Sequence, residues 1–375
     1  METERIPLAD ATGRVLAEPV VADRASPPHD ASAMDGYALR LADAQPGVTL
    51  PVAGRTRMGG APPPLAPGTA VQITTGAAVP VDAELVVKRE DTDETVPGRV
   101  TLRDQAVVRP GLSIRRAGEN APAGATIAAA GATVTPGLAA AAATYGAAHL
   151  RVRRRVRLVV LVTGDEFSDD ATPPPWQIRE CNGVAAAGWS ATRPHVELLG
   201  VRRVPDLRAA TVDALDQAAQ EADLVLTTGG VSMGDGDHVP HAAVAAGFEA
   251  AYHRVAMRPG KPNLGAVHPG GAVLLGLPGN PVSVLCGLTR FAGPVAARLA
   301  GATPSAGLCV AVEPGHRPPP IGLWQYHPAA RSADGRAVPL PHRGSGDTAA
   351  LAAAELFLET PPGTALGAEA PAWAV

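Results

Sequence analysis

The stretch TTGGVSMGDGD, residues 227–237, places four glycines and a serine between an apolar run and an aspartate. Glycines permit positive φ and close backbone approach, and exposed N–H groups in such a loop can cradle an anion. A helix after His238 would add its positive end. A tight strand-to-helix turn without a ligand explains the same glycines. The residues that would form the cradle are Gly229, Gly230, Ser232, Gly234 and Gly236.

Two carboxylates favour the ligand over the bare turn. Asp237 ends the glycine-rich stretch, and Glu166 lies in TGDEF (163–167) with Thr163 and Gly164. Carboxylates beside a phosphate cradle would repel the ligand unless a hard cation such as Mg²⁺ lies between them. Glu166 and Asp237 are therefore predicted metal ligands at a metal-bridged phosphate.

A third loop, GLPGNPVS (276–283), offers oxyanion contacts at a helix start. It contains Pro278, Gly279, Asn280 and Ser283. Asn280 suits the N-cap of a helix running through 298, and Pro281 suits its first position. Simple capping explains this motif as well as ligand binding does.

Two fixed cations occur in MRPGKPN (257–263). Arg258 and Lys261 are three residues apart on a loop stiffened by Pro259 and Pro262. Of the 32 basic residues, only Lys88 and Lys261 are lysines. A lysine kept in so arginine-rich a chain indicates a need for a compact ammonium group. The loop is predicted to bind an oxyanion.

Two further stretches carry only turn signals by themselves. DASAMDGYALR (30–40) puts Asp35 before a glycine, and QITTGAAVP (72–80) puts Thr75 before Gly76.

The elements that position these loops alternate between strands and helices. Strands are predicted at 157–163, 195–201, 223–228 and 271–277, and helices near 178–188, at 206–222 with Asp206 as its cap, and through 298. This order predicts a parallel sheet with helices on both sides. Such sheets bind ligands beyond the carboxyl ends of their strands, so the three loops predict one composite site.

The remaining segments are β-rich, and 375 residues exceed what one core usually serves. Residues 34–120 lack helical periodicity and are cut by Pro/Gly turns, residues 137–150 read as a helix, and the chain after 301 reads as a small all-β module.

Composition excludes several function classes. The net charge of -4 gives no global attraction for nucleic acid, and we interpret RVRRRVR (151–157) as a solvated strand edge. Cys181, Cys286 and Cys309 match no disulfide or CxxC pattern, which indicates a reducing compartment. The polar start METERIPLAD and the absence of an apparent membrane-length apolar stretch predict a cytoplasmic protein without membrane contact.

Together the motifs resemble one family in order and spacing. SAMDGYA (32–38), ITTGAAVP (73–80), TGDE (163–166), TTGGVSMGDGD (227–237), RPGKP (258–262) and LPGNPVS (277–283) are similar to those of the molybdopterin molybdenumtransferases. These are molybdenum insertases that include the E domain of gephyrin. The resemblance spans nearly the whole chain and is weakest after 301.

The resemblance implies a multidomain α/β fold in a homodimer. Its expected parts are a helical linker and dimerisation module (1–33 plus 121–150), a β-rich lobe (34–120), a molybdopterin-binding-like α/β domain with a parallel sheet (151–301) and a C-terminal β-barrel (302–375). The implied reaction is Mg²⁺-dependent insertion of molybdate into adenylylated molybdopterin, which releases AMP and molybdenum cofactor. The implied partners are the pterin substrate, the molybdopterin adenylyltransferase and recipient molybdoenzymes.

Site residues carry over position by position. Glu166 and Asp237 match metal and nucleotide acids, and Asp206 matches a further acid. Arg258 and Lys261 match basic residues near molybdate, where the family commonly has two lysines. Asp35 and Thr75 match residues presented across the dimer. The implied catalytic set is Asp35, Glu166, Asp206, Asp237, Arg258 and Lys261. The implied substrate-binding set is Thr75, Thr163, Gly164, Gly229, Gly230, Ser232, Gly234, Arg254, Pro262, Pro278, Gly279, Asn280, Ser283 and Ser345.

Two positions depart from the family pattern. Asn120 stands where an aspartate is usual, and Tyr326 stands where an arginine is expected; His327 or Arg343 would compensate. Two other functions stay open. A molybdopterin adenylyltransferase would need only residues 157–300, and a non-catalytic dimeric scaffold would keep the fold alone. The additional β lobe argues against the first, and the retained Glu166, Asp237 and Lys261 argue against the second.

Overall fold

The computed structural model describes residues 2–232, 234, 236–315 and 317–375. By its internal contacts the chain divides into two compact units. Unit 1 comprises Met1–Glu18, Ala130–Thr135 and Arg151–Val375, and unit 2 comprises Pro19–Ala129 and Pro136–Leu150. The finer division into four parts stays a prediction. Met233 and Asp235 of the glycine-rich motif lie outside the described residues.

A six-stranded sheet of order β14-β13-β15-β19-β18-β16 forms the centre of unit 1. The first four of these strands pair in parallel, as predicted, while β18 and β16 add an antiparallel edge that the sequence analysis did not include. The bounds are β13 Val156–Thr163, β14 Val196–Val204, β15 Leu224–Thr228, β16 Glu249–His253, β18 Leu264–Val267 and β19 Val273–Leu277.

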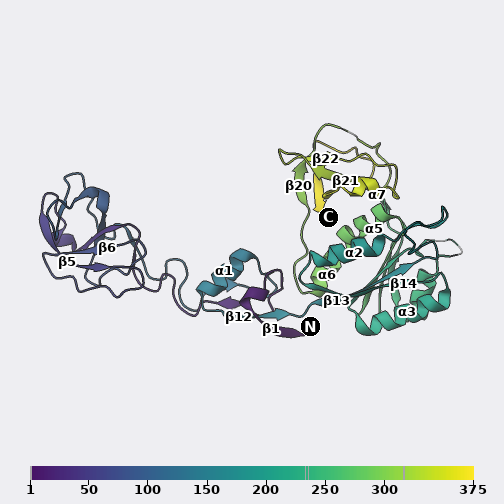
Figure 1. Cartoon of the computed structure of the whole chain (residues 1–375), viewed down its shortest axis with the longest axis horizontal. Coiled ribbons are helices and arrows are strands. Elements are labelled where there is room, and N and C mark those ends of the chain that lie inside the picture. Colours follow the sequence, from purple (N-terminus) through teal and green to yellow (C-terminus); the bar gives the residue numbers. More distant parts are fainter. Residues whose placement is uncertain (1, 233, 235, 316) are drawn as a thin grey trace. The chain divides into compact units, whose positions relative to one another are not determined.

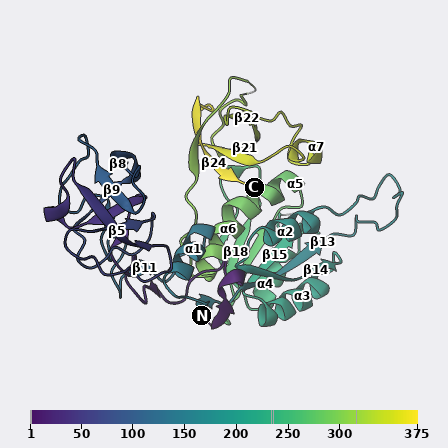
Figure 2. The same ribbon diagram turned by 60° about the vertical axis from the view of Figure 1, so that its left-hand side comes forward.

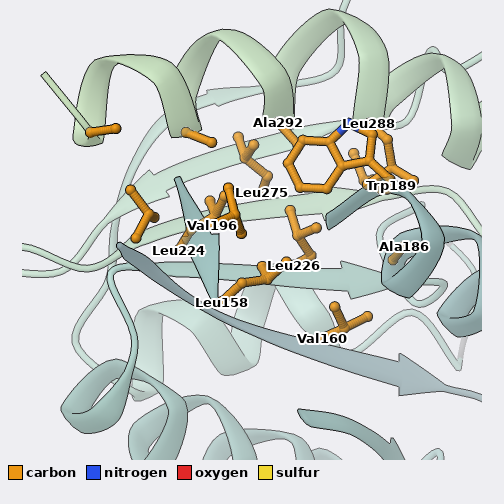
Figure 3. Close-up of a cluster of buried hydrophobic side chains, with 14 of the residues drawn as sticks. Leu158, Val160, Ala186, Trp189, Val196, Leu224, Leu226, Leu275, Leu288 and Ala292 are labelled. Atoms are coloured by element: carbon orange, nitrogen blue, oxygen red, sulfur yellow. The ribbon is translucent and has the colours of Figure 1, made fainter. Parts of the chain in front are cut away.

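Helices cover both faces of this sheet (Figures 1 and 2). Along β13, Leu158 and Val160 face one helical layer and Val159 and Leu161 face the other, because side chains alternate along a strand. Trp189 packs over the first face (Figure 3). That face carries α2 (Asn182–Ala191), α5 (Pro281–Gly287), the π-helical turn η4 (Leu288–Ala292) and α6 (Gly293–Leu299), and the second carries α3 (Arg208–Glu221) and α4 (Val239–Ala245).

The continuous helix Pro281–Leu299 is long and apolar enough to span a membrane by length and composition. The expectation that the chain contains no such stretch is therefore wrong. Half of the helix is buried inside the protein. Its residues Val284, Leu288 and Ala292 point into the hydrophobic core over the sheet (Figure 3 labels the last two). Burial between a sheet and a barrel accounts for its apolar composition.

The predicted cap of the helix at 206–222 is also wrong. α3 begins at Arg208, Leu207 occupies the N-cap position in an extended conformation, and no side chain caps the helix. The amide of Asp206 instead donates to Oδ1 of Asp165 at 3.2 Å. The backbone of Asp206 is thus tied to the loop after β13, and its side chain does not cap α3.

The C-terminal part of unit 1 is a small barrel-like sheet of order β17-β21-β23-β24-β20, with β22 paired to β21. A bridge between Val312 and Ala337 brings the end of β20 to β22 and nearly closes the sheet. The predicted β-barrel is confirmed. The bounds are β17 Met257–Arg258, β20 Leu308–Ala311, β21 Trp324–Arg331, β22 Ala337–Pro339, α7 Thr348–Leu351, β23 Leu356–Thr360 and β24 Glu369–Ala374.

Unit 2 is β-rich, as predicted, around a sheet of order β7-β4-β6-β5-β9-β8. Its helix α1 (Pro136–Thr144) ends before the predicted 150, and β12 (His149–Arg153) follows and pairs with β1 (Thr3–Pro7). The other elements are η1 Leu8–Asp10 in unit 1, and β2 Val20–Val21, β3 Ala31–Ser32, β4 Gly36–Leu39, η2 Leu41–Asp43, β5 Thr49–Thr56, β6 Ala70–Ile73, β7 Leu85–Lys88, η3 Arg89–Asp91, β8 Thr92–Asp93, β9 Arg99–Leu102, β10 Ile114–Arg115 and β11 Thr126–Ala128 in unit 2.

The basic run at 151–157 is partly paired with carboxylates of the protein. Arg154 donates to both carboxylate oxygens of Asp223 at 2.6 and 2.8 Å, and the amide of Arg157 donates to Oδ2 at 2.8 Å. Burial by itself would raise the pKa of Asp223, but these hydrogen bonds outweigh it and lower the pKa to about 2. The run thus joins β12 to β13, and Arg151, Arg154 and Arg157 form ion pairs within the protein.

Asp223→Asn should destabilise the folded protein by about 2 kcal/mol at neutral pH, because a lowered folded-state pKa is a stabilising term above the unfolded pKa. That term disappears as pH falls from about 4 to about 2, so the difference in unfolding free energy should shrink over that window. Urea unfolding at pH 7 and below pH 3 measures it, with the exposed Asp216→Asn as the control. A pH-independent difference would contradict this reading.

Candidate active site

Three loops meet beyond the carboxyl ends of the parallel strands. The amide of Gly229 donates to the carbonyl of Leu277 at 3.0 Å, and a Cβ placed on Gly279 would lie 3.6 Å from the Cα of Gly229. Thr163 closes the first strand, and its hydroxyl donates to the carbonyl of Thr228 at 3.2 Å. The structure therefore brings the predicted loops at 163–167, 227–237 and 276–283 side by side.

The glycines after β15 are required by this close packing. Gly229 and Gly230 have φ of 93° and 65°, which other residues rarely adopt. A Cβ on Gly229 would lie 2.8 Å from the hydroxyl oxygen of Thr163. The backbone of Gly230 also accepts the amide of Val239, where α4 begins behind His238, as predicted.

Gly229→Ala should destabilise the protein by about 1–3 kcal/mol, because its Cβ meets Thr163 and its φ is strained. Gly236→Ala is the matched control in the same loop, since a Cβ there meets open space. Thermal unfolding of both variants measures the effect, and equal melting temperatures for the two would disprove the packing argument.

Acidic side chains gather beyond the ends of β13, β14 and β15. Burial raises the pKa of Asp206, and the neighbouring carboxylates of Asp165 and Asp237 raise it further, while His238 opposes them. Asp237 also accepts the amide of Gly234 at 2.7 Å, which shapes the loop. Glu166 is exposed, and its carboxylate lies over Gly164, where a Cβ would overlap it.

These carboxylates could occupy some of the coordination positions of a magnesium ion. All offer oxygen donors, and Mg²⁺ sites commonly use one or two carboxylates together with substrate phosphates and water. Within residues 2–232, 234, 236–315 and 317–375, no three His, Cys, Asp or Glu side chains are grouped to hold a metal by themselves. The donor set therefore fits a cation that is shared with a bound phosphate.

A cavity of about 740 Å³ lies between the α/β sheet and the barrel. Its walls carry the cations Arg258, Lys261 and Arg343, and none of its described lining residues is an aspartate or glutamate. A pocket with cations and no carboxylates favours an anion. The predicted site residues that line it are Arg258, Lys261, Pro262, Pro278, Asn280, Ser283 and Ser345.

A rigid loop holds the two neighbouring cations. The amide of Val255 donates to the carbonyl of Lys261 at 2.9 Å, and the amide of Arg254 donates to that of Asn263 at 2.7 Å. Asn263 is fully buried, and its side-chain amide donates to the carbonyl of Gly260 at 3.0 Å. Arg254 has a φ of 70°, an uncommon conformation for a non-glycine residue. Arg254 lies at the base of this loop and is not among the residues that line the cavity.

The start of α5 forms another wall. Asn280 occupies the predicted N-cap position, but its side chain makes no capping hydrogen bond. The amide of Val282 donates to the carbonyl of Ser345 at 3.0 Å, which ties the loop 342–345 to the helix start. Sequence reasoning missed Asn182, whose side chain donates to the carbonyl of Gly279 at 2.7 Å, and the lining residues Gln325 and His342.

The two predicted site residues of unit 2 contact one another. The amide and hydroxyl of Thr75 donate to Oδ1 of Asp35 at 2.6 and 2.9 Å, and these bonds lower the pKa of Asp35. Asn120, which stands where the family usually has aspartate, accepts a hydrogen bond from the Arg115 guanidinium at 2.7 Å. Its side-chain amide donates to the hydroxyl of Ser26 at 3.2 Å. Thr75 and Asn120 line a separate cavity of about 330 Å³ in this unit.

Comparison with known proteins identifies relatives of both units of the chain. Residues 1–146 match the family described as MoeA N-terminal region (domain I and II), and residues 159–298 match the probable molybdopterin binding domain. The chain is 39% identical over 301 residues to molybdopterin molybdenumtransferase 2 of Mycobacterium tuberculosis, covering 77% of this chain and 73% of that protein. It is 31% identical over 377 residues to the Bacillus subtilis molybdopterin molybdenumtransferase, covering 97% and 87%.

A solved structure extends the match over the whole fold. The molybdopterin biosynthesis moeA protein of Pyrococcus horikoshii OT3 superposes with a TM-score of 0.83 at 25% identity, covering 100% of this chain and 95% of that chain. The family models, the curated relatives and the shared multidomain fold lead to one assignment: the chain belongs to the molybdopterin molybdenumtransferase family, enzymes of molybdenum cofactor biosynthesis.

Proposed function

We propose that this enzyme inserts molybdate into adenylylated molybdopterin in a Mg²⁺-dependent reaction that releases AMP. The observation that carries the proposal is the separation of charge in unit 1. Asp206, in the loop after β14, lies near Asp237, in the loop after β15, while the cavity lined by Arg258 and Lys261 has no carboxylate among its described lining residues. A substrate with a phosphate and a separate oxyanion needs both environments.

The cationic cavity would hold molybdate. Arg258 and Lys261 supply charge from a loop whose backbone bonds fix its shape, and Ser283 and Ser345 supply polar contacts from the opposite wall. A guanidinium and an ammonium bind tetrahedral oxyanions by charge-assisted hydrogen bonds. The cations would therefore fix the incoming group before reaction.

The glycine-rich loops would hold the phosphate of the adenylyl group. The amide of Gly229 already donates to the carbonyl of Leu277, so the backbone N–H of Gly230 is the one that this turn would direct at the phosphate. Glu166 and Asp237 would hold Mg²⁺ against that phosphate, and the bound ion supplies neutralisation of phosphate charge. Positioning by the loops then accounts for most of the rate, without a protein nucleophile.

The proposal includes a homodimer in the cytoplasm. Asp35 and Thr75 would act from the β-rich lobe of one subunit toward the site of the other. The two hydrogen bonds from Thr75 to Asp35 support this proposal, because they hold the two side chains together in one conformation. The adenylyltransferase and the recipient molybdoenzymes are the proposed protein partners.

One assay tests the proposal against its alternatives. The purified protein is mixed with adenylylated molybdopterin, molybdate and Mg²⁺, and AMP and molybdenum cofactor are quantified. Release of both supports the insertase. Consumption of ATP with plain molybdopterin would instead identify an adenylyltransferase, and inactivity in both mixtures would identify a scaffold.

A further inference from the structure

Arg290 lies in an irregular turn of the long core helix and is not among the residues that line the oxyanion cavity. It belongs to the π-helical turn η4, between α5 and α6. Single π-helical turns inside α-helices are rare and frequently occur at functional sites. Through Arg290 the turn makes a polar contact between the helix and the barrel.

Arg290 connects three strands of the barrel. Its guanidinium forms an ion pair with Glu359 of β23 at 2.9 Å, and the indole N–H of Trp373 in β24 donates to the same carboxylate oxygen at 3.1 Å. The guanidinium lies 3.6 Å from the centre of the Trp373 ring and 5.3 Å from that of Tyr326 in β21. The ion pair is largely buried, at 19% and 13% side-chain exposure.

Tyr326 links this network to the oxyanion cavity. It is 7% exposed and lines the cavity together with Ser283. Burial raises the pKa of Tyr326, and a hydrogen bond from Arg290 opposes that rise. Ser283 and Arg290 belong to the same continuous helix, seven residues apart. The helix therefore supplies Ser283 to one wall of the cavity and Arg290 to the contact with Tyr326 in the opposite wall.

We propose that Arg290 is a positioning residue for the oxyanion site: by holding Tyr326 and β21 against the helix, it sets the spacing between the two walls of the cavity. The proposal rests on the function proposed above for its effect on activity. A planar guanidinium serves this purpose because it can stack on two rings while it pairs with a carboxylate, which a lysine ammonium cannot do.

The test compares Arg290→Met and Arg290→Lys with a control, Arg202→Met. Arg202 pairs with Glu221 in the α/β sheet at 33% exposure of both side chains, and neither residue lines the cavity. Arg290→Met should raise the KM for molybdate roughly tenfold while kcat changes less than about threefold, because a misplaced wall weakens binding more than chemistry. Arg290→Lys should fall between wild type and Arg290→Met, and the control should match wild type.

Hydrogen–deuterium exchange gives a readout that does not depend on activity. In Arg290→Met, amide exchange at 324–331 should accelerate roughly tenfold while exchange at 156–163 stays at the wild-type rate. A folded Arg290→Met protein with wild-type KM and exchange would overturn the inference, as would an equal KM increase in Arg202→Met. A wild-type protein without AMP release would refute the proposed function, and the exchange rates together with calorimetry of molybdate binding would still decide the role of Arg290.

Discussion

Replacing Asp237 with asparagine should reduce Mg²⁺-dependent AMP release roughly a hundred- to a thousandfold, the scale of losing one preorganised charge contact. The asparagine oxygen can still accept the amide of Gly234, so the loop keeps its shape and only the charge is lost. Single-turnover AMP release across a Mg²⁺ titration measures the effect. The expected curve loses its Mg²⁺-dependent phase.

Asp216→Asn is the matched control for this experiment. Asp216 is exposed on α3 and hydrogen-bonds only Gln220 among the described contacts, so its loss should leave AMP release unchanged. Circular dichroism and thermal unfolding confirm that both variants fold. An Asp237→Asn protein with the wild-type Mg²⁺ response would remove Asp237 from the metal site.

Lys261→Met should lower kcat/KM for molybdate about a hundredfold, because a charge-assisted contact to the oxyanion is lost that Arg258 and Arg343, fixed elsewhere in the cavity wall, do not replace. The chain offers an unusually clean control, since its other lysine, Lys88, lies in unit 2 and pairs with Asp91 at 3.6 Å. Steady-state rates at varied molybdate concentration measure both Lys261→Met and Lys88→Met. Only the first should change.

Lys261→Arg tests whether charge alone is sufficient. An arginine already stands at 258, and a second planar guanidinium would not reproduce a compact ammonium, so rescue should be incomplete. Full recovery in Lys261→Arg would show that any cation suffices. Wild-type kinetics in Lys261→Met would exclude this residue from the oxyanion site.

The parallel core was predictable because its signals are local. The run 157–163 is apolar on both faces, as expected for a strand covered by two helical layers, and it became β13. The antiparallel strand Glu249–His253 gave no such signal, since it is mostly exposed and does not alternate. The assumed cap at Asp206 failed because the chain is still extended at Leu207, so the N-cap position falls on Leu207 and the helix begins at Arg208.

The candidate site was predictable only in its loops. Lys261 and the glycines at 229 and 230 are marked by their own short motifs, and the structure places them in rigid, closely packed turns. The second cavity wall comes from Tyr326 and its neighbours in the barrel, and the contact of Arg290 with Glu359 joins distant strands. Such long-range pairings leave no periodicity or spacing in the sequence.

Calorimetric titration of adenylylated molybdopterin with and without Mg²⁺ tests the central claim most directly. Mg²⁺ should tighten binding to the wild-type protein at least about tenfold, because it offsets the repulsion between the carboxylates and the phosphate. This gain should vanish in Asp237→Asn, because the cation then lacks one of its two protein carboxylates. Equal affinity in both buffers, in the wild-type protein, would contradict a cation shared between these acids and the substrate.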